Sequence, residues 1–168
     1  MKKSLLVLVF VALIFSLTAC GGGQDKISAA GAGYSCNAKI TYGSEIKADA
    51  KLKVTGGGVF SATIISPKEF EGLTFNFDNE DMSLSYGDLK ADKISVADDF
   101  YGFADLLNGI FLKLTTGSPT AVGSGDDYIY NGQSDLYRFS VTFNGDGFPK
   151  QISVPQAGLT VTLSDWQY

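Results

Sequence analysis

The stretch Ile46-Lys47-Ala48-Asp49-Ala50-Lys51-Leu52-Lys53-Val54 decides the fold of this chain. Apolar and charged residues alternate along it, and this period of two is typical of a β-strand with one buried face and one solvated face. The glycines of Gly56-Gly57-Gly58 permit a tight turn after it. Val59 to Ser66 then predicts a second strand, which Pro67 ends. The core is therefore expected on one face of a β-sheet.

Further segments with the same period follow along the chain. The sequence Asn144-Gly145-Asp146-Gly147 between two of them is a strong hairpin signal. We predict a mainly β domain with a curved antiparallel sheet of about seven to nine strands. The further strands are expected at 73–77, 82–86, 89–94, 128–130, 137–143, 151–154 and 159–163, with 89–94 the least regular.

One segment in the middle of the chain has a helical period instead. Its apolar residues recur in steps of three and four, which predicts one face of an amphipathic helix over 95–116, starting at Ser95. Gly102 and Gly109 leave open two short helices in place of one. A wide sheet must curl, split into layers or be covered, and this segment is its natural cover. The predicted fold is thus α+β, mainly β: a half-barrel capped by a central helical segment. The apolar face comprises Val96, Phe100, Phe103, Leu107, Ile110 and Leu114.

The N-terminal residues have the layout of a bacterial secretory signal. A basic head, Met1 to Ser4, precedes an apolar run from Leu5 to Leu17, which is shorter than the roughly 20 residues that a membrane-spanning helix needs. The run ends in Leu17-Thr18-Ala19-Cys20, which resembles the lipobox of bacterial lipoproteins. That resemblance implies cleavage before Cys20 and acylation of its sulfur; an ordinary signal peptide with a chance cysteine is the alternative.

These features predict three parts: a signal peptide at 1–19, a lipidated tether at 20–33 that is rich in Gly, Ala and Ser, and one domain at 34–168. The mature chain is expected on a membrane, facing away from the cytoplasm, held by the lipid on Cys20. Gly21 is not the Asp that resembles an inner-membrane retention signal, so the outer membrane is expected in a host with two membranes.

The charge of the chain argues against polyanionic partners. The 13 basic and 18 acidic residues give a net charge of −5. Removal of Lys2 and Lys3 with the signal leaves 11 basic residues against 18 acidic ones, or −7. Because the sequence shows no basic cluster, we expect neither nucleic-acid binding nor a basic patch for anionic headgroups. Membrane attachment is expected through acyl chains.

The sequence has little that could perform catalysis. It contains no His, which removes Ser-His-Asp and Cys-His arrangements and the commonest zinc ligand. The acidic pairs Glu80-Asp81, Asp98-Asp99 and Asp126-Asp127 fit turns and a helix start better than facing carboxylates, since adjacent strand residues point to opposite faces. We predict no catalytic residue, no metal and no cofactor, and hence no enzyme.

Cys36 has no partner within the chain if Cys20 is acylated. Two interpretations remain: a small buried residue near the start of a strand, or a thiol that pairs with another protein.

The chain is rich in aromatic residues, with 12 Phe and 8 Tyr. Those on predicted inner faces either form plain core or line an apolar cavity where sheet and helix do not fully close. The candidate lining residues are Phe75, Phe77, Leu84, Phe100, Phe103, Leu107, Phe139 and Val141.

The order of elements over about 36–166 resembles the outer-membrane lipoprotein carrier superfamily, which includes LolA, LolB and carriers of the LppX type. Matching features are the paired strands 46–54 and 59–65 with Ser66-Pro67, the helical insertion 95–116, and the step from Gly147 to Ile152 with Pro149. The resemblance implies a non-enzymatic half-barrel with a cavity for acyl chains, and so a lipid or acylated ligand. The rival hypothesis is an interaction or sensing module of the cell envelope with a fully packed core.

One departure from the superfamily concerns arginine. LolA-type carriers use an Arg in lipoprotein transfer, whereas the only Arg here, Arg138, stands on a different strand. The role is therefore not assigned to it.

Overall fold

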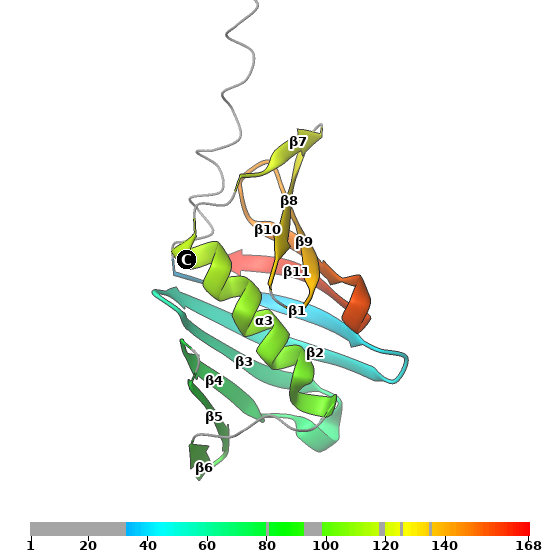
Figure 1. Ribbon diagram of the computed structural model, residues 1–168. Helices are drawn as coiled ribbons and strands as arrows, with labels where there is room; N and C mark the ends of the chain where they lie inside the picture. The colour runs from blue at the N-terminus through cyan, green and yellow to red at the C-terminus, as the bar shows by residue number, and fades with distance from the viewer. Residues whose placement is uncertain (1–32, 80, 93–98, 118–119, 125, 135) are drawn as a thin grey trace, which may run out of the picture.

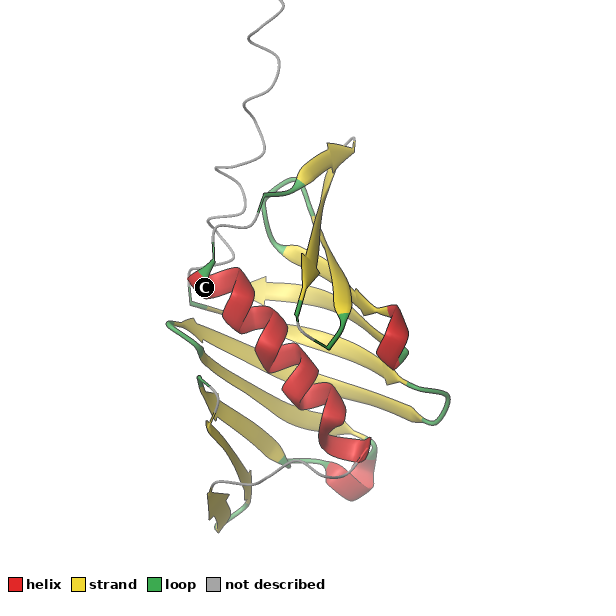
Figure 2. Ribbon diagram, viewed as in Figure 1, coloured by secondary structure: helices red, strands yellow, loops and turns green. Residues whose placement is uncertain are grey.

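The computed structural model describes residues 33–79, 81–92, 99–117, 120–124, 126–134 and 136–168. In these ranges, eleven strands form one antiparallel sheet that is not closed into a barrel, with one long helix on one face (Figure 2). The predicted fold class is confirmed. The sheet is wider than the seven to nine strands expected.

The sheet begins with six strands that follow one another in sequence. Each pairs antiparallel with the next, apart from a short 3-10 turn, η2 (Lys68–Phe70), after the third. These strands are β1 (Tyr34–Tyr42), β2 (Ile46–Gly56), β3 (Val59–Ser66), β4 (Thr74–Asp78), β5 (Asp81–Tyr86) and β6 (Leu89–Asp92).

The helix α3 (Asp99–Thr116) comes next and is followed by the remaining strands. The order across the sheet is β6-β5-β4-β3-β2-β1-β11-β10-β9-β8-β7, so the last strand pairs with the first. Ala38 of β1 lies opposite Leu163 of β11. The remaining elements are β7 (Val122–Ser124), β8 (Asp127–Gln133), β9 (Arg138–Phe143), β10 (Pro149–Val154), η3 (Pro155–Ala157) and β11 (Leu159–Gln167).

Two strands account for the extra width of the sheet. In β1 buried residues alternate with the polar Asn37, Lys39 and Thr41, so the period is present in the sequence although no strand was predicted there. β7 has three residues, which is too short for any period to appear. The predicted hairpin at 144–147 does connect the antiparallel pair β9 and β10.

The alternation of β2 divides the sheet into two faces. Ala50, Leu52 and Val54 are buried on the face toward α3, which we call the inner face, while Lys51 and Lys53 are exposed on the opposite, outer face. Side chains point to alternate sides of a strand, so this division continues across the sheet.

The helix α3 lies across the inner face and packs mainly on β2 and β3 (Figure 1). It is one continuous helix over Asp99–Thr116, so the alternative of two short helices does not apply to these residues. The expected N-cap, Ser95, lies outside the described residues. Within the described ranges, no helix combines the length and apolarity that a membrane span needs.

The two glycines within α3 lie where tyrosine side chains approach the helix. A Cβ built on Gly102 would stand 2.8 Å from the Tyr42 hydroxyl, and one on Gly109 would stand 2.7 Å from the Tyr137 hydroxyl. Glycine therefore permits close contact on this side of α3, which offsets its cost of about 1 kcal/mol in a helix.

Candidate functional site between the sheet and the helix

The candidate lining residues lie on the inner face and on α3. All whose side chains are described are buried, except Leu84, which is half-buried. Phe100 is in the first turn of α3, and its side chain is outside the described part. That these residues line a cavity for an acyl chain stays a prediction. Phe75 and Phe77 are on β4, Leu84 on β5, Phe103 and Leu107 on α3, and Phe139 and Val141 on β9.

One group of rings joins α3 to the strands beneath it. The ring centroids of Phe75 and Phe103 are 5.6 Å apart in an edge-on arrangement. Phe60 of β3 stacks on Phe111 of α3 at 5.0 Å and lies 5.9 Å from Phe77. Offset and edge-on aromatic pairs stabilise beyond the area they bury. These rings form the described centre of the interface.

Phe60 and Phe111 were absent from the candidate set. The signal for Phe60 was present in the sequence, because Phe60, Ala62 and Ile64 alternate along β3. All three are buried at 2% exposure or less.

A second group of rings lies on β8 and β9. Phe139 is 5.8 Å from Tyr130 and 6.2 Å from Tyr137, measured between ring centroids. The Tyr137 hydroxyl approaches α3 at Gly109, so this group also meets the helix. The predicted set therefore divides into two ring groups, one around Phe75 and Phe103 and one around Phe139.

Two buried polar atoms in this interior lack a hydrogen-bond partner within the described structure: the Tyr34 hydroxyl and Asn108 Oδ1. The amide nitrogen of Asn108 donates to the backbone oxygen of Asn79 at 2.7 Å, but its oxygen accepts no hydrogen bond from the residues that the structure describes. An unsatisfied buried polar atom costs about 1–3 kcal/mol. Either atom offers a hydrogen bond to a polar group of a bound molecule.

Burial also controls the ionisable groups near the start of β1. It raises the pKa of the Tyr34 hydroxyl above its usual range, with a smaller contribution from Cys36. It raises the pKa of the Cys36 thiol to about 12. Cys36 is free and only 2% exposed, which agrees with its interpretation as a small buried residue.

The site offers apolar contact in place of coordination chemistry. Over the ranges that the structure describes, His, Cys, Asp and Glu side chains form no group of three or more that could hold a metal ion. Its polar features include the two unpartnered atoms above and the Tyr42 and Tyr137 hydroxyls that approach α3. The described interface between the sheet and α3 is therefore mainly apolar.

Comparisons with known proteins give matches only at the level of structure. No protein-family model matches the sequence, and no curated protein matches it significantly. The chain is similar to an uncharacterized conserved protein from Thermus thermophilus, with a TM-score of 0.49 and 8% identity over 85% of this chain and 83% of that one.

Two further matches have informative descriptions. A LolA superfamily protein from Nitrosomonas europaea matches with a TM-score of 0.45 and 10% identity, over 88% of this chain and 94% of that one. An outer membrane lipoprotein-sorting protein domain from Vibrio parahaemolyticus matches with a TM-score of 0.44 and 10% identity, over 86% and 91%. Similarity this low does not assign the chain to a family, so its function has to be inferred from its own residues.

Proposed function

We propose that this chain is a membrane-anchored lipoprotein outside the cytoplasm, which binds a lipid or an acylated ligand between its sheet and α3. One observation supports the ligand above all: a single helix covers the inner face of an open sheet, and aromatic rings meet at that interface. The Tyr34 hydroxyl and Asn108 Oδ1 add two polar positions for a headgroup or carboxyl.

The anchor is supported by the sequence alone. Cys20 follows a basic head, an apolar run and the residues Leu17-Thr18-Ala19. Two or more acyl chains on one residue give stable membrane attachment. In a host with two membranes, Gly21 favours the outer one.

A ligand would enter by displacing ring contacts of α3. The helix also donates hydrogen bonds from Asn108 to Asn79 and from Lys113 to the backbone oxygen of Gln133, and both acceptors lie at strand ends. The aromatic rings make apolar contacts, so their displacement leaves no hydrogen-bond donor or acceptor unpaired. An alkyl chain can therefore replace these contacts at a low cost in free energy. Binding is therefore expected to shift the rings of α3 while these two hydrogen bonds persist.

The same rings favour the rival function, an interaction or sensing module with a packed core. At 5.0 Å and 5.6 Å between centroids, Phe60–Phe111 and Phe75–Phe103 already contact one another without a ligand. In that case the core serves stability alone, and no small molecule binds inside.

A fluorescent fatty acid distinguishes the two functions. The protein is the mature chain, 20–168, in which Cys20→Ser removes the acylation site. We expect saturable binding that unlabelled fatty acid displaces. Phe139→Asp places a charge in the interior and should abolish binding, whereas Ser140→Asp, the neighbouring residue on the outer face, should leave it intact. Leu84→Asn is a milder second variant, because Leu84 is only half-buried.

Absence of saturable binding by the folded parent chain would reject the ligand and favour the packed module. The anchor has a separate test, since the intact mass of protein purified from its own cells should show acyl chains on Cys20. An unmodified Cys20 in the cleaved chain would reject the anchor.

A further inference from the structure

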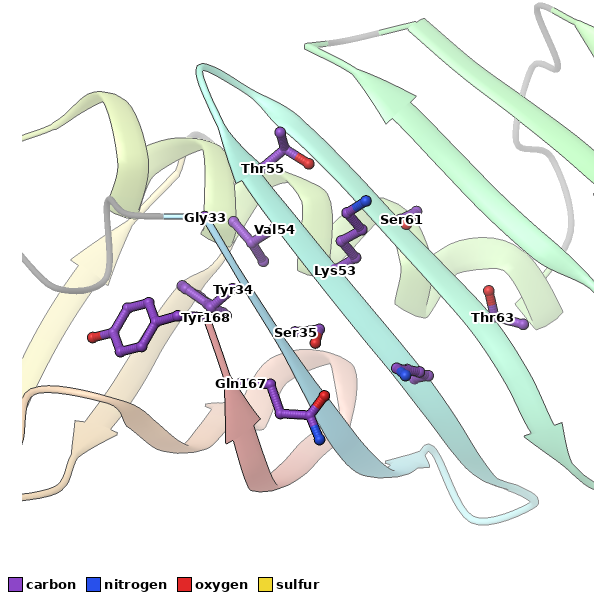
Figure 3. A pocket seen from close by; sticks show the side chains of 11 residues that line it. Gly33, Tyr34, Ser35, Lys53, Val54, Thr55, Ser61, Thr63, Gln167 and Tyr168 are labelled. Carbon is purple, nitrogen blue, oxygen red and sulfur yellow. The ribbon is translucent and has the colours of Figure 1, made fainter.

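The outer face carries a groove of about 490 Å³ at the end of the sheet where the described chain begins. Figure 3 shows this groove, which we call the outer groove. It crosses four adjacent strands, because Gln167 of β11 lies opposite Ser35 of β1, Ser35 lies opposite Lys53 of β2, and Lys53 lies opposite Ser61 of β3. The outer groove lies on the face opposite α3 and is distinct from the candidate ligand site.

The lining of the outer groove is suited to an anion. Its only charged side chains are those of Lys51 and Lys53, and both residues are exposed. Hydroxyl groups of Ser35, Ser61 and Thr63 surround them. Neither ammonium group forms an ion pair within the described residues, where the pairs are Lys90–Asp92 and Lys150–Asp127. Ammonium and hydroxyl donors together bind phosphate oxygens.

The pairing of β1 with β2 brings further lysines to the outer face. Lys39 and Lys47 are exposed on the same outer face of β1 and β2. With Lys51 and Lys53, four lysines therefore lie on this face of β1 and β2, in a chain whose net charge is −5. Acidic residues also lie on this face; of these, Asp49 and Asp165 are on the strands that form the groove, and neither lines it.

Both of these carboxylates already have partners. Asp49 accepts a hydrogen bond from the Ser66 hydroxyl at 2.8 Å. Asp165 accepts from Asn37 at 2.9 Å and from Ser164 at 3.0 Å, and these bonds lower its pKa. The lysines of the groove therefore remain available to an external anion.

The position of the groove points to the anion's source. Gly33, the first described residue, lines the groove and follows Cys20 by 13 residues. That length of chain spans at most about 45 Å. An acylated Cys20 would therefore hold the outer groove close to the headgroups of its own membrane. Tyr168, which is 79% exposed at the rim, is of a type favoured at membrane interfaces.

We propose that the outer groove docks the domain on its membrane by binding the phosphate groups of anionic phospholipids, a proposal that rests on the anchor at Cys20 but not on the interior ligand. Lys51 and Lys53 supply the charge, and the surrounding hydroxyls supply further donors. Docking turns the outer face toward the bilayer and α3 away from it.

Vesicle co-sedimentation tests the docking with the mature chain in which Cys20→Ser removes the lipid. We expect binding to vesicles of phosphatidylcholine with phosphatidylglycerol that exceeds binding to phosphatidylcholine alone and falls with added salt. The double variant Lys51→Gln/Lys53→Gln should bind about 30-fold more weakly, because each basic side chain near an anionic surface contributes about fivefold. The control Lys68→Gln/Lys113→Gln makes the same change in net charge at exposed positions of η2 and α3, outside the strands of the outer face, and should bind like the parent.

An equal loss in both double variants, or no preference for anionic vesicles, would overturn the docking. Competition by low concentrations of inorganic phosphate would also overturn it, by showing a site for a soluble anion. These results leave the interior ligand untouched, since the fluorescent fatty acid should bind Lys51→Gln/Lys53→Gln as it binds the parent.

Amine labelling of the acylated full-length protein gives a second test that needs no variant. In anionic vesicles, an acylating reagent should modify Lys51 and Lys53 several-fold more slowly, relative to Lys68 on η2 and Lys113 on α3, than in detergent. Equal relative rates of labelling in vesicles and in detergent would show that the outer groove stays exposed, and would contradict docking.

Discussion

The two faces of strands β2 and β3 make different surfaces from the same backbone. On the inner face, Leu52 and Phe60 are at most 2% exposed and pack beneath α3, whereas Lys53 and Ser61 on the outer face line an open groove. Because side chains alternate, each face can change without the other. Inner-face substitutions should therefore affect stability and interior binding, and outer-face ones should affect membrane docking alone.

The largest effect is expected from Phe60→Ala on the inner face. Phe60 stacks on Phe111 and contacts Phe77, so its removal leaves a cavity between β3 and α3. We expect a loss of about 3–5 kcal/mol in the free energy of unfolding, measured by denaturant titration. The adjacent outer-face variant Ser61→Ala should change it by less than about 0.5 kcal/mol. Similar losses for both would show that the faces are not independent.

Thiol reactivity compares the two faces within one strand. In the mature Cys20→Ser chain, Cys36 is the only thiol, and burial raises its pKa to about 12. Added Thr41→Cys places a second thiol on the exposed outer face of β1. At pH 8 we expect this new thiol to react with iodoacetamide at least about 100-fold faster than Cys36, because thiolate is the reactive form. A single fast phase for both thiols would contradict the burial of Cys36.

The same pKa predicts a pH effect on stability. The thiol is protonated more readily in the folded state than in the unfolded state, so its contribution is fully present at neutral pH. That contribution is lost as pH rises from about 8.5, the unfolded value, toward about 12. Unfolding titrations of the parent and Cys36→Ala should therefore converge in alkaline solution. A constant difference between them across this range would contradict the raised pKa.

Gly132→Ala tests the packing of the second ring group. A Cβ on Gly132 would overlap the ring of Phe139, its cross-strand neighbour on β9. We expect a loss of about 1–3 kcal/mol in the free energy of unfolding, because a buried ring must move. Gly109→Ala meets only the end of the half-buried Tyr137 side chain and gains helix propensity, so it should change stability by less than about 1 kcal/mol. A larger loss of stability for Gly109→Ala than for Gly132→Ala would contradict this account. It would show that the Tyr137 side chain cannot move away from α3, whereas the ring of Phe139 can move away from β8.

The smallest effect on stability is expected from Lys51→Gln/Lys53→Gln. Both side chains are exposed and lack an ion pair among the described residues, so the free energy of unfolding should stay within about 0.5 kcal/mol. Denaturant titration checks this, and it makes any loss of vesicle binding attributable to the groove. A loss of several kcal/mol would instead mean that these lysines stabilise the sheet.

The strands and the helix could be predicted because each follows a period set by its own residues. Alternation along 46–54 identified β2 and its buried face, and the spacing of Phe103, Leu107 and Ile110 identified the buried side of α3. β1 alternates as regularly as β2 and could have been predicted, whereas the three residues of β7 are too few to show a period.

What joins distant parts of the chain could not be predicted. The outer groove combines Gly33, Lys53 and Gln167, which only the pairing of β1 with both β2 and β11 brings together. Phe75 on β4 and Phe139 on β9 likewise fall into separate ring groups because of the order of strands across the sheet. The period of a strand predicts which face a residue is on, but not which strands are neighbours.

Photo-crosslinking with a fatty acid that carries a photoreactive group in its alkyl chain tests most directly whether a ligand binds between the sheet and α3. After illumination of the mature Cys20→Ser chain and peptide mapping by mass spectrometry, we predict adducts at the inner face and the helix, around Phe75, Leu107 or Phe139, that excess unlabelled fatty acid suppresses. Adducts confined to outer-face residues such as Ser61 and Thr63, or none that the competitor suppresses, would contradict binding in the interior.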